Sequence, residues 1–220
     1  MIGKGKSISH GVAALEYDLA KEINGQAVAT EIARHELYGC TGAEMVQEMK
    51  PYHIDFPNVK NNCLRFEVSP SIEESATFTD ADWAELGNDF MQRMGLANHQ
   101  YIIIRHSGTE SKKEQAHLHI LANRVSLSGE LYRDNWIGKK ATEAANAIAK
   151  ERNFVQSQDI GKVNKAEIKE AMDGVLKKMQ GFDFTKFKEE LGKRGFKVRE
   201  ARASTGKLNG YYVTARSGTE

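Results

Sequence analysis

The 220-residue sequence contains only three prolines, two cysteines and no long apolar run. So few prolines argue against a proline-rich linker or a disordered tail. Cys40 and Cys63 cannot by themselves build a disulfide framework or a four-cysteine zinc site. No apolar stretch approaches the roughly 18 residues that span a bilayer, and the basic residues 1–10 have no apolar segment behind them, as a secretory signal would. These absences predict a soluble cytoplasmic protein without membrane insertion.

The sequence also lacks an excess of charge of one sign, because it contains 31 Lys/Arg and 30 Asp/Glu and its net charge is +1. Near neutrality counts, at face value, against a nucleic-acid partner. The charge is uneven, however. Residues 162–216 hold 14 Lys/Arg against 7 Asp/Glu, whereas residues 1–161 hold 17 against 22. Such asymmetry can mark an anionic partner at the basic end, although lysine-rich solvated helix faces explain it equally well.

Hydrophobic periodicity predicts a mixture of helices and strands. We interpret the chain as α+β, with a central antiparallel sheet and helices packed on one face of it. The expected strands are residues 63–69, 100–106, 116–125, 196–203 and 209–215, and the expected helices are residues 10–23, 41–49, 80–94, 139–152, 165–180 and 185–194. Thr79 and Asp82 form a capping-box pattern before the third of these helices. No repeat or linker is evident, so residues 1–220 are interpreted as one domain. Because the sequence ends directly after its last expected strand, we interpret it as the N-terminal part of a longer protein.

The strand at 116–123 carries His117 and His119, two imidazoles at i and i+2 that point to the same face and can bind one metal ion. His106 ends the preceding strand, its expected antiparallel neighbour. Strict alternation groups His106 with Ile102 and Ile104 and not with the ligand face, unless the chain turns where the strand ends. Three neutral imidazoles with open coordination positions suit a divalent ion that also holds substrate. Ordinary strand histidines are the alternative interpretation of the pair alone.

Glu67 lies on the polar face of the strand at 63–69. From there its carboxylate could orient one of the metal-binding imidazoles. A solvated carboxylate paired with Arg65 is the alternative.

The segment AHLHILANRV (116–125) resembles the His-hydrophobic-His motif of HUH endonucleases, and more narrowly the HxH…NRV motif of conjugative relaxases, also called mobilization nucleases. The order of IGKGKSIS, LEYDLAKE, LRFEVSPSIEE, FMQRMGL, QYIIIRH and FKEELGKRGFKV is also similar to that family, so the resemblance covers nearly the whole chain. It implies an HUH endonuclease-like fold. It also implies a metal-dependent enzyme that nicks one DNA strand at an origin of transfer, leaves a 5′-phosphotyrosyl intermediate and a free 3′-OH, and starts conjugative mobilization.

The resemblance implies that Tyr17 is the nucleophile and that His106, His117 and His119 bind the metal, most readily Mn²⁺ or Mg²⁺. At 100° per residue Tyr17 lies roughly opposite the apolar stripe of its helix, which is compatible with this role. Tyr38 and His10 are weaker alternative nucleophiles.

Two features depart from the relaxase pattern. Gly108 stands where an Asp is expected, and ten residues separate His106 from His117, so the connector carries an insertion. Glu110 or Glu114 could supply the missing carboxylate.

The expected partner is single-stranded or hairpin DNA at an origin of transfer, together with accessory mobilization proteins and a coupling protein, in the bacterial cytoplasm. The candidate DNA-contacting residues, which are basic or flank the histidine motif, are Lys4, Lys6, Arg105, Asn123, Arg124, Lys197, Arg199 and Arg202. The alternative functions are a rolling-circle replication initiator, a non-catalytic DNA-binding module of the same fold, and a metal-binding protein unrelated to DNA.

Overall fold

The structure is a computed structural model that describes residues 1–108 and 115–215. The chain divides into two compact units, Met1–Ser157 and Gln158–Glu220, whereas the sequence was interpreted as a single domain. The boundary falls at the start of helix α6 (Ser157–Leu176), after a short non-helical segment over residues 152–156. Composition gives no mark of this boundary, because neither a proline, glycine or serine cluster nor a charge run stands there.

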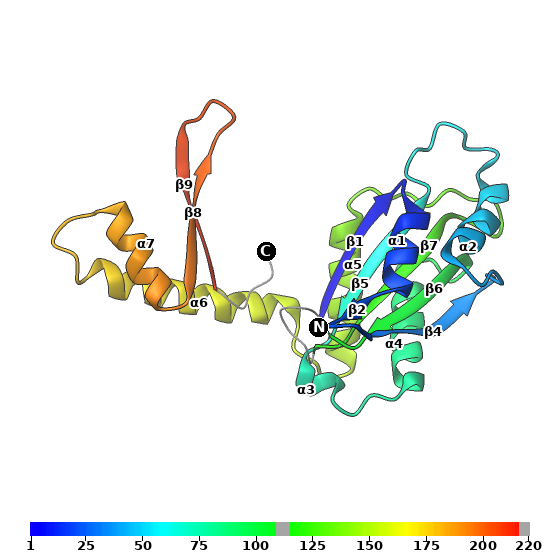
Figure 1. The fold of residues 1–220 in the computed structure, drawn as a ribbon, viewed down its shortest axis with the longest axis horizontal. Coiled ribbons are helices and arrows are strands. Elements are labelled where there is room, and N and C mark those ends of the chain that lie inside the picture. Colours follow the sequence, from blue (N-terminus) through cyan, green and yellow to red (C-terminus); the bar gives the residue numbers. More distant parts are fainter. Residues whose placement is uncertain (109–114, 216–220) are drawn as a thin grey trace. The chain divides into compact units, whose positions relative to one another are not determined.

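The first unit is built on a five-stranded sheet in which every recorded pairing is antiparallel. Figure 1 shows this sheet with helices around it. This confirms the α+β class and the central antiparallel sheet. A small hairpin, β2 (Glu22–Ile23) and β3 (Gln26–Ala27), precedes the last edge strand. The strand order across the sheet is β1 (Ile2–Ile8), β5 (Cys63–Ser69), β7 (His117–Ser126), β6 (His99–His106) and β4 (Ala29–His35).

One face of the sheet packs against α4 (Asp80–Arg93) and α5 (Ile137–Glu151). Alternate strand residues such as Phe66 and Ile120 are buried there, in contact with helix residues such as Phe90. The capping box expected at Thr79 is present and starts α4. A short helix, α3 (Ile72–Ser75), precedes α4.

The opposite face is also covered, by α1 (Gly11–Leu19) and α2 (Gly42–Met49), which is followed by the 3-10 turn η1 (Lys50–His53). The expectation that helices pack on one face only is therefore wrong. Leu15 of α1 lies over Ile102, Ile104 and Leu121, each nearly inaccessible to solvent. Residues on both faces of β6 are apolar and buried, as expected for a strand that is covered by helices on both sides.

In the edge strand β1, glycines face one side of the sheet and lysines face the other. Gly3 and Gly5 face α5, where a Cβ on Gly3 would meet the Ala145 Cβ at 2.6 Å and one on Gly5 would meet Phe66 at 2.8 Å. Lys4 and Lys6 point to the α1 face. Glycine thus allows α5 to approach the strand closely, and the alternation leaves two cations on the other face.

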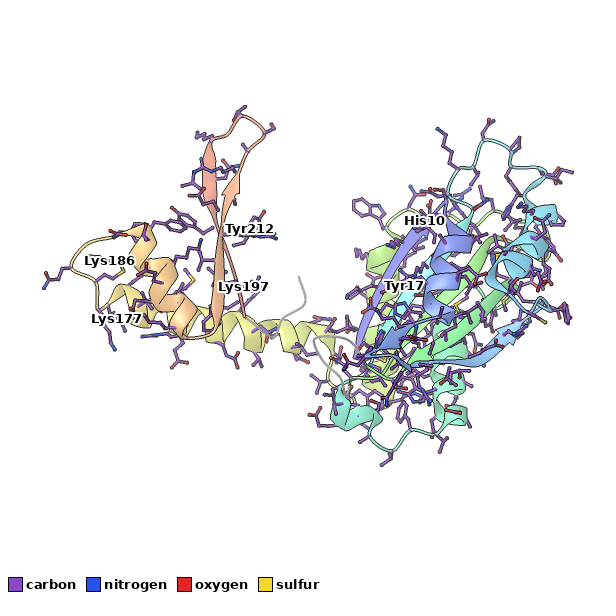
Figure 2. All side chains as sticks on the ribbon, viewed as in Figure 1. His10, Tyr17, Lys177, Lys186, Lys197 and Tyr212 are labelled. Atoms are coloured by element: carbon purple, nitrogen blue, oxygen red, sulfur yellow. The ribbon has the colours of Figure 1, made fainter. Side chains whose placement is uncertain are left out.

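The second unit contains α6, α7 (Phe184–Lys193) and a hairpin of β8 (Phe196–Arg202) and β9 (Leu208–Ala215). Its small core includes Val175, Phe187 and Val198. On the other side of the hairpin, Arg199 stacks on Tyr212 with its guanidinium carbon 5.2 Å from the ring centre. Figure 2 shows Lys197 and Tyr212 in this hairpin. None of the helices in the two described stretches is long and apolar enough to cross a membrane.

Candidate active site

Strand pairing brings three imidazoles together at one end of β6 and β7. His106 lies directly opposite His117, and Ile104 lies opposite His119. One ring nitrogen from each of the three histidines lies within 4.8 Å of the others, and the Nε2 atoms of His117 and His119 are 3.1 Å apart. This spacing fits a single metal ion bound by three nitrogens.

The expectation that His106 alternates away from the ligand face is wrong. Residues directly opposite in an antiparallel pair project to the same face. His106 therefore shares a face with both His117 and His119, and Ile102 and Ile104 lie on that face too, under α1. The face is apolar along most of its length and ligand-bearing at its end.

Backbone carbonyls fix the orientation of two of the rings. The His106 Nε2 lies 2.7 Å from the Asp18 carbonyl oxygen, and the His117 Nδ1 lies 3.2 Å from the Gln115 carbonyl oxygen. A nitrogen in contact with a carbonyl must donate its proton, so the second nitrogen of each ring carries the lone pair. His106 thus offers Nδ1 and His117 offers Nε2 to a metal.

Burial keeps two of these imidazoles neutral. Desolvation lowers the pKa of His106, and it lowers the pKa of His119 to about 2, with the nearby His106, His117, Arg65 and Lys4 acting in the same direction. A neutral imidazole keeps a lone pair for a metal. Both rings can therefore bind a cation without carrying a charge themselves.

Asp18 completes the site and was missed in the sequence. Its carboxylate is 1% exposed and accepts two hydrogen bonds from Arg65, at 3.0 Å from Nε and 2.5 Å from Nη2. The same carboxylate lies 3.8 Å from the His119 Nδ1. The sequence does indicate that Asp18 faces the protein interior, because it stands between Leu15 and Leu19, at the border of the apolar stripe of its helix.

Glu67 lies opposite His119 in the strand register, but its carboxylate accepts a hydrogen bond from Lys4 Nζ at 3.1 Å. Within residues 1–108 and 115–215, no hydrogen bond or ion pair joins Glu67 to an imidazole. The imidazoles are contacted instead by backbone carbonyls and by the Asp18 carboxylate, and a catalytic role for Glu67 stays a prediction.

Tyr17 lies on the exposed side of α1, with 56% of its surface accessible, as the helical spacing indicated. Lys21, one turn further on, donates a hydrogen bond to the Tyr17 Oη at 2.7 Å. Figure 2 shows Tyr17 on α1 and His10 at the helix start. Tyr17 directly precedes Asp18, which contacts the imidazoles, whereas His10 lies eight residues before Asp18, roughly 12 Å along the helix axis.

Three of the candidate DNA-contacting residues are engaged within the protein. Asn123 is fully buried, accepts from His53 Nε2 at 2.6 Å and donates to Gln100 at 3.0 Å, so a direct contact with DNA is wrong for it. Arg124 binds Asp134 and two backbone carbonyls, and Arg105 binds Asp80. These are anchors between strands and loops.

The remaining candidates, Lys4, Lys6, Lys197, Arg199 and Arg202, are exposed. Gly108 is the last described residue before the insertion. Glu110 and Glu114, which were considered as a replacement carboxylate, lie outside the described residues.

Comparison with solved structures finds the conjugative relaxase TrwC in complex with oriT DNA. Its metal-bound form is 11% identical over 94% of this chain and 74% of that chain, with a TM-score of 0.41. The metal-free form is 10% identical with the same coverage and a TM-score of 0.42. The copper-bound form is 13% identical over 94% of this chain and 75% of that chain, with a TM-score of 0.38. With TM-scores below 0.5, these likenesses assign no residue here.

Among curated protein sequences, none is significantly similar to this chain. A family model does match: the relaxase model described as MobA/VirD2-like, nuclease domain, covers residues 17–154. The match begins at Tyr17 and includes all three histidines. Because it covers more than half of the 220 residues, the chain belongs to the MobA/VirD2-like relaxase family and carries its nuclease domain.

Proposed function

We propose that this chain is a DNA relaxase that nicks one strand at an origin of transfer by transesterification through Tyr17. The link between α1 and the imidazoles is the observation that carries the proposal. The Asp18 carbonyl binds His106, and Tyr17 is the preceding residue. A phosphate held at the three histidines would lie near the helix that carries Tyr17. Membership of a nuclease family supports the same chemistry.

In the proposed reaction the Tyr17 Oη attacks the scissile phosphorus in line with the leaving 3′ oxygen. A P–O bond forms to Tyr17, the bond to the 3′ oxygen breaks, the phenol proton is lost and the 3′ oxygen gains a proton. His106, His117 and His119 would hold Mn²⁺ or Mg²⁺, which when bound supplies positive charge against that developing on the non-bridging oxygens. The bond energy is retained in a 5′-phosphotyrosyl linkage, so the strand can be rejoined.

Lys21 supports Tyr17 as the nucleophile. Its ammonium is 2.7 Å from the phenol oxygen and 4.9 Å from the ring centre. A cation at hydrogen-bond distance stabilises negative charge on that oxygen. In the proposed step Lys21 therefore orients the Tyr17 Oη and stabilises it as the proton leaves.

The proposed substrate is single-stranded or hairpin DNA. Lys4 and Lys6 in the first unit, and Lys197, Arg199 and Arg202 in the second, are exposed cations that would contact its phosphates. Arg199 stacked on Tyr212 could also support an unpaired base. Accessory mobilization proteins and a coupling protein would act with the relaxase in the bacterial cytoplasm.

The test uses labelled single strands that tile the DNA flanking the gene, incubated with the protein and Mn²⁺ or Mg²⁺. We expect a protein–DNA adduct that survives denaturation and that EDTA prevents. DNA binding without an adduct on any strand would leave a non-catalytic binding module as the function.

Variants then assign the nucleophile and the metal ligands. Tyr17→Phe should abolish the adduct and keep DNA binding, whereas the control Tyr38→Phe should keep the adduct, since the Tyr38 hydroxyl contacts Glu36. His117→Ala and His119→Ala should each weaken metal binding. An adduct formed by Tyr17→Phe would move the nucleophile elsewhere, and unchanged metal binding in both histidine variants would refute the metal site.

A further inference from the structure

We propose that a cavity between β1 and β5, beside His119, binds one phosphate of the DNA strand, and that Lys6 is its decisive cation. The inference rests on the proposed function, since it places a neighbour of the scissile phosphate. The cavity has a volume of about 200 Å³. Its polar lining consists of Lys4, Lys6, Arg65, Glu67 and His119.

The strand register explains why these side chains meet. Lys4 lies opposite Glu67, and Glu67 lies opposite His119, so the three form one row across the sheet. Lys6 lies opposite Arg65 in the row two residues along. All of them project to the α1 face, because directly paired residues share a face. The row that ends at His119 connects the cavity with the three imidazoles.

The glycines of β1 make this placement a property of the fold. With Gly3 and Gly5 packed under α5, Lys4 and Lys6, which alternate with these glycines, must project to the opposite face. A shift of one residue in register would bury both lysines against α5. Folding therefore fixes two ammonium groups beside the imidazoles.

Charge pairing singles out Lys6. Arg65 is held by the Asp18 carboxylate, and Lys4 by Glu67 at 3.1 Å. Lys6 makes no ion pair or side-chain hydrogen bond with any residue in the described part of the chain. The cavity therefore has one positive charge in excess, and a phosphodiester carries one negative charge that would match it.

His119 belongs both to the cavity lining and to the three imidazoles. A phosphate in the cavity would therefore belong to a nucleotide next to the one being cut. By holding that neighbour, Lys6 would fix the register of the strand over Tyr17. Substitution of Lys6 should therefore weaken ground-state binding of DNA even where no reaction occurs.

The test uses the full chain and a fluorescein-labelled strand of twelve thymidine nucleotides, in the presence of EDTA. Fluorescence anisotropy measures the binding constant over a range of NaCl concentrations. Removing one phosphate-binding cation should make the slope of log K against log salt shallower by about 0.7 on a single strand. If the two proteins bind equally at 1 M salt, this difference corresponds to about fivefold weaker binding by the variant at 0.1 M. We expect this reduction for Lys6→Met, and recovery of the slope for Lys6→Arg.

Lys139→Met is the matched control, because Lys139 is 72% exposed and lies on α5, on the other face of the sheet. Its slope should equal that of the wild type. The proposal is overturned if Lys6→Met keeps the wild-type slope, or if the slope for Lys139→Met falls by as much. No cleavage is needed, so a chain that binds through Lys6 but forms no adduct would refute the relaxase chemistry and leave the phosphate site standing.

Discussion

Asp18 joins α1, the helix that carries Tyr17, to the imidazoles through both its backbone and its side chain. The carbonyl orients His106, and the carboxylate holds the Arg65 guanidinium, whose Nη2 is 3.3 Å from the His119 Nδ1. Partners that orient metal ligands commonly change metal affinity 10–100-fold when altered. Asp18 would thus influence a bound metal through the imidazoles that it contacts.

Asp18→Asn should therefore weaken Mn²⁺ binding by roughly 10-fold or more, measured by titration calorimetry. The substitution removes the negative charge that faces Arg65 and frees the guanidinium to compete for His119. Asp89→Asn, at a surface pair with Arg93, is the control and should bind Mn²⁺ as the wild type does. Equal affinities for Asp18→Asn and wild type would show that Asp18 has no part in the metal site.

Lys21→Met should slow single-turnover adduct formation by about tenfold or more, because the Tyr17 oxygen is then without the cation that stabilises its charge. Lys21→Arg should restore part of the rate, since a guanidinium can donate to the same oxygen. Quenched time courses on denaturing gels measure both. A rate for Lys21→Met equal to that of the wild type would exclude a role for this lysine.

At this scale, spacing on regular elements predicted the shared face of His117 and His119 and the exposed side of Tyr17. His106 was expected as a ligand because it ends the neighbouring strand and because of the family resemblance, whereas strict alternation placed it off the ligand face.

The sequence did not predict Asp18, Arg65 or the internal role of Asn123. The roles of Asp18 and Arg65 depend on contacts between α1, β5 and β7, whose paired residues lie 47 and 54 positions apart in the chain. The role of Asn123 depends on its contacts with His53 and Gln100. Periodicity within one element carries no information on such contacts.

Among the elements, β1 has the packing that is most sensitive to the size of its side chains. Gly3→Ala should destabilise the protein by about 1–3 kcal/mol, because the new Cβ would press on the Ala141 carbonyl and the Ala145 side chain. Urea denaturation followed by circular dichroism measures the change. In Gly138→Ala the new Cβ meets only the Gly5 carbonyl oxygen, at 3.5 Å, so the stability should be unchanged or higher. Similar destabilisation in both variants would contradict the packing of β1 under α5.

Elements with strong periodicity were predicted to within a few residues, as for β5, β7 and α4, whose cap at Thr79 is confirmed. The strand β4 was missed because most of its residues are half-buried and its alternation is weak. Helix α6 begins at Ser157 and not at residue 165, with Asn164 inside it. Only Ala171 and Val175 of that helix are buried, so no apolar stripe marks its first half.

At the scale of the whole molecule, the two units differ in charge. Met1–Ser157 holds 17 Lys/Arg and 21 Asp/Glu, a balance of −4, and Gln158–Glu220 holds 14 and 9, a balance of +5. The near-neutral total therefore hides a basic unit attached to an acidic nuclease unit. An acidic surface repels DNA at long range, so a basic unit would raise the association rate and the affinity.

A chain ending at Ser157 should bind Mn²⁺ like the full chain, because every imidazole contact lies within the first unit. Its binding to single-stranded DNA should depend less on salt, with a slope of log K against log salt that is shallower by about 2. The three cations Lys197, Arg199 and Arg202 would be absent, and each contributes about 0.7 to the slope. Anisotropy titrations measure both slopes. An unchanged slope would show that the second unit makes no contact with DNA.

The chemical identity of the adduct tests the proposed role of Tyr17 most directly. The covalent complex formed with Mn²⁺ and a cleaved strand is digested with protease and nuclease, and tandem mass spectrometry locates the residue that carries the nucleotide. We expect a 5′-phosphate ester on the Tyr17 oxygen, together with a free 3′-OH on the released strand. A nucleotide on any other residue, or a tyrosine linked to a 3′-phosphate, would contradict it.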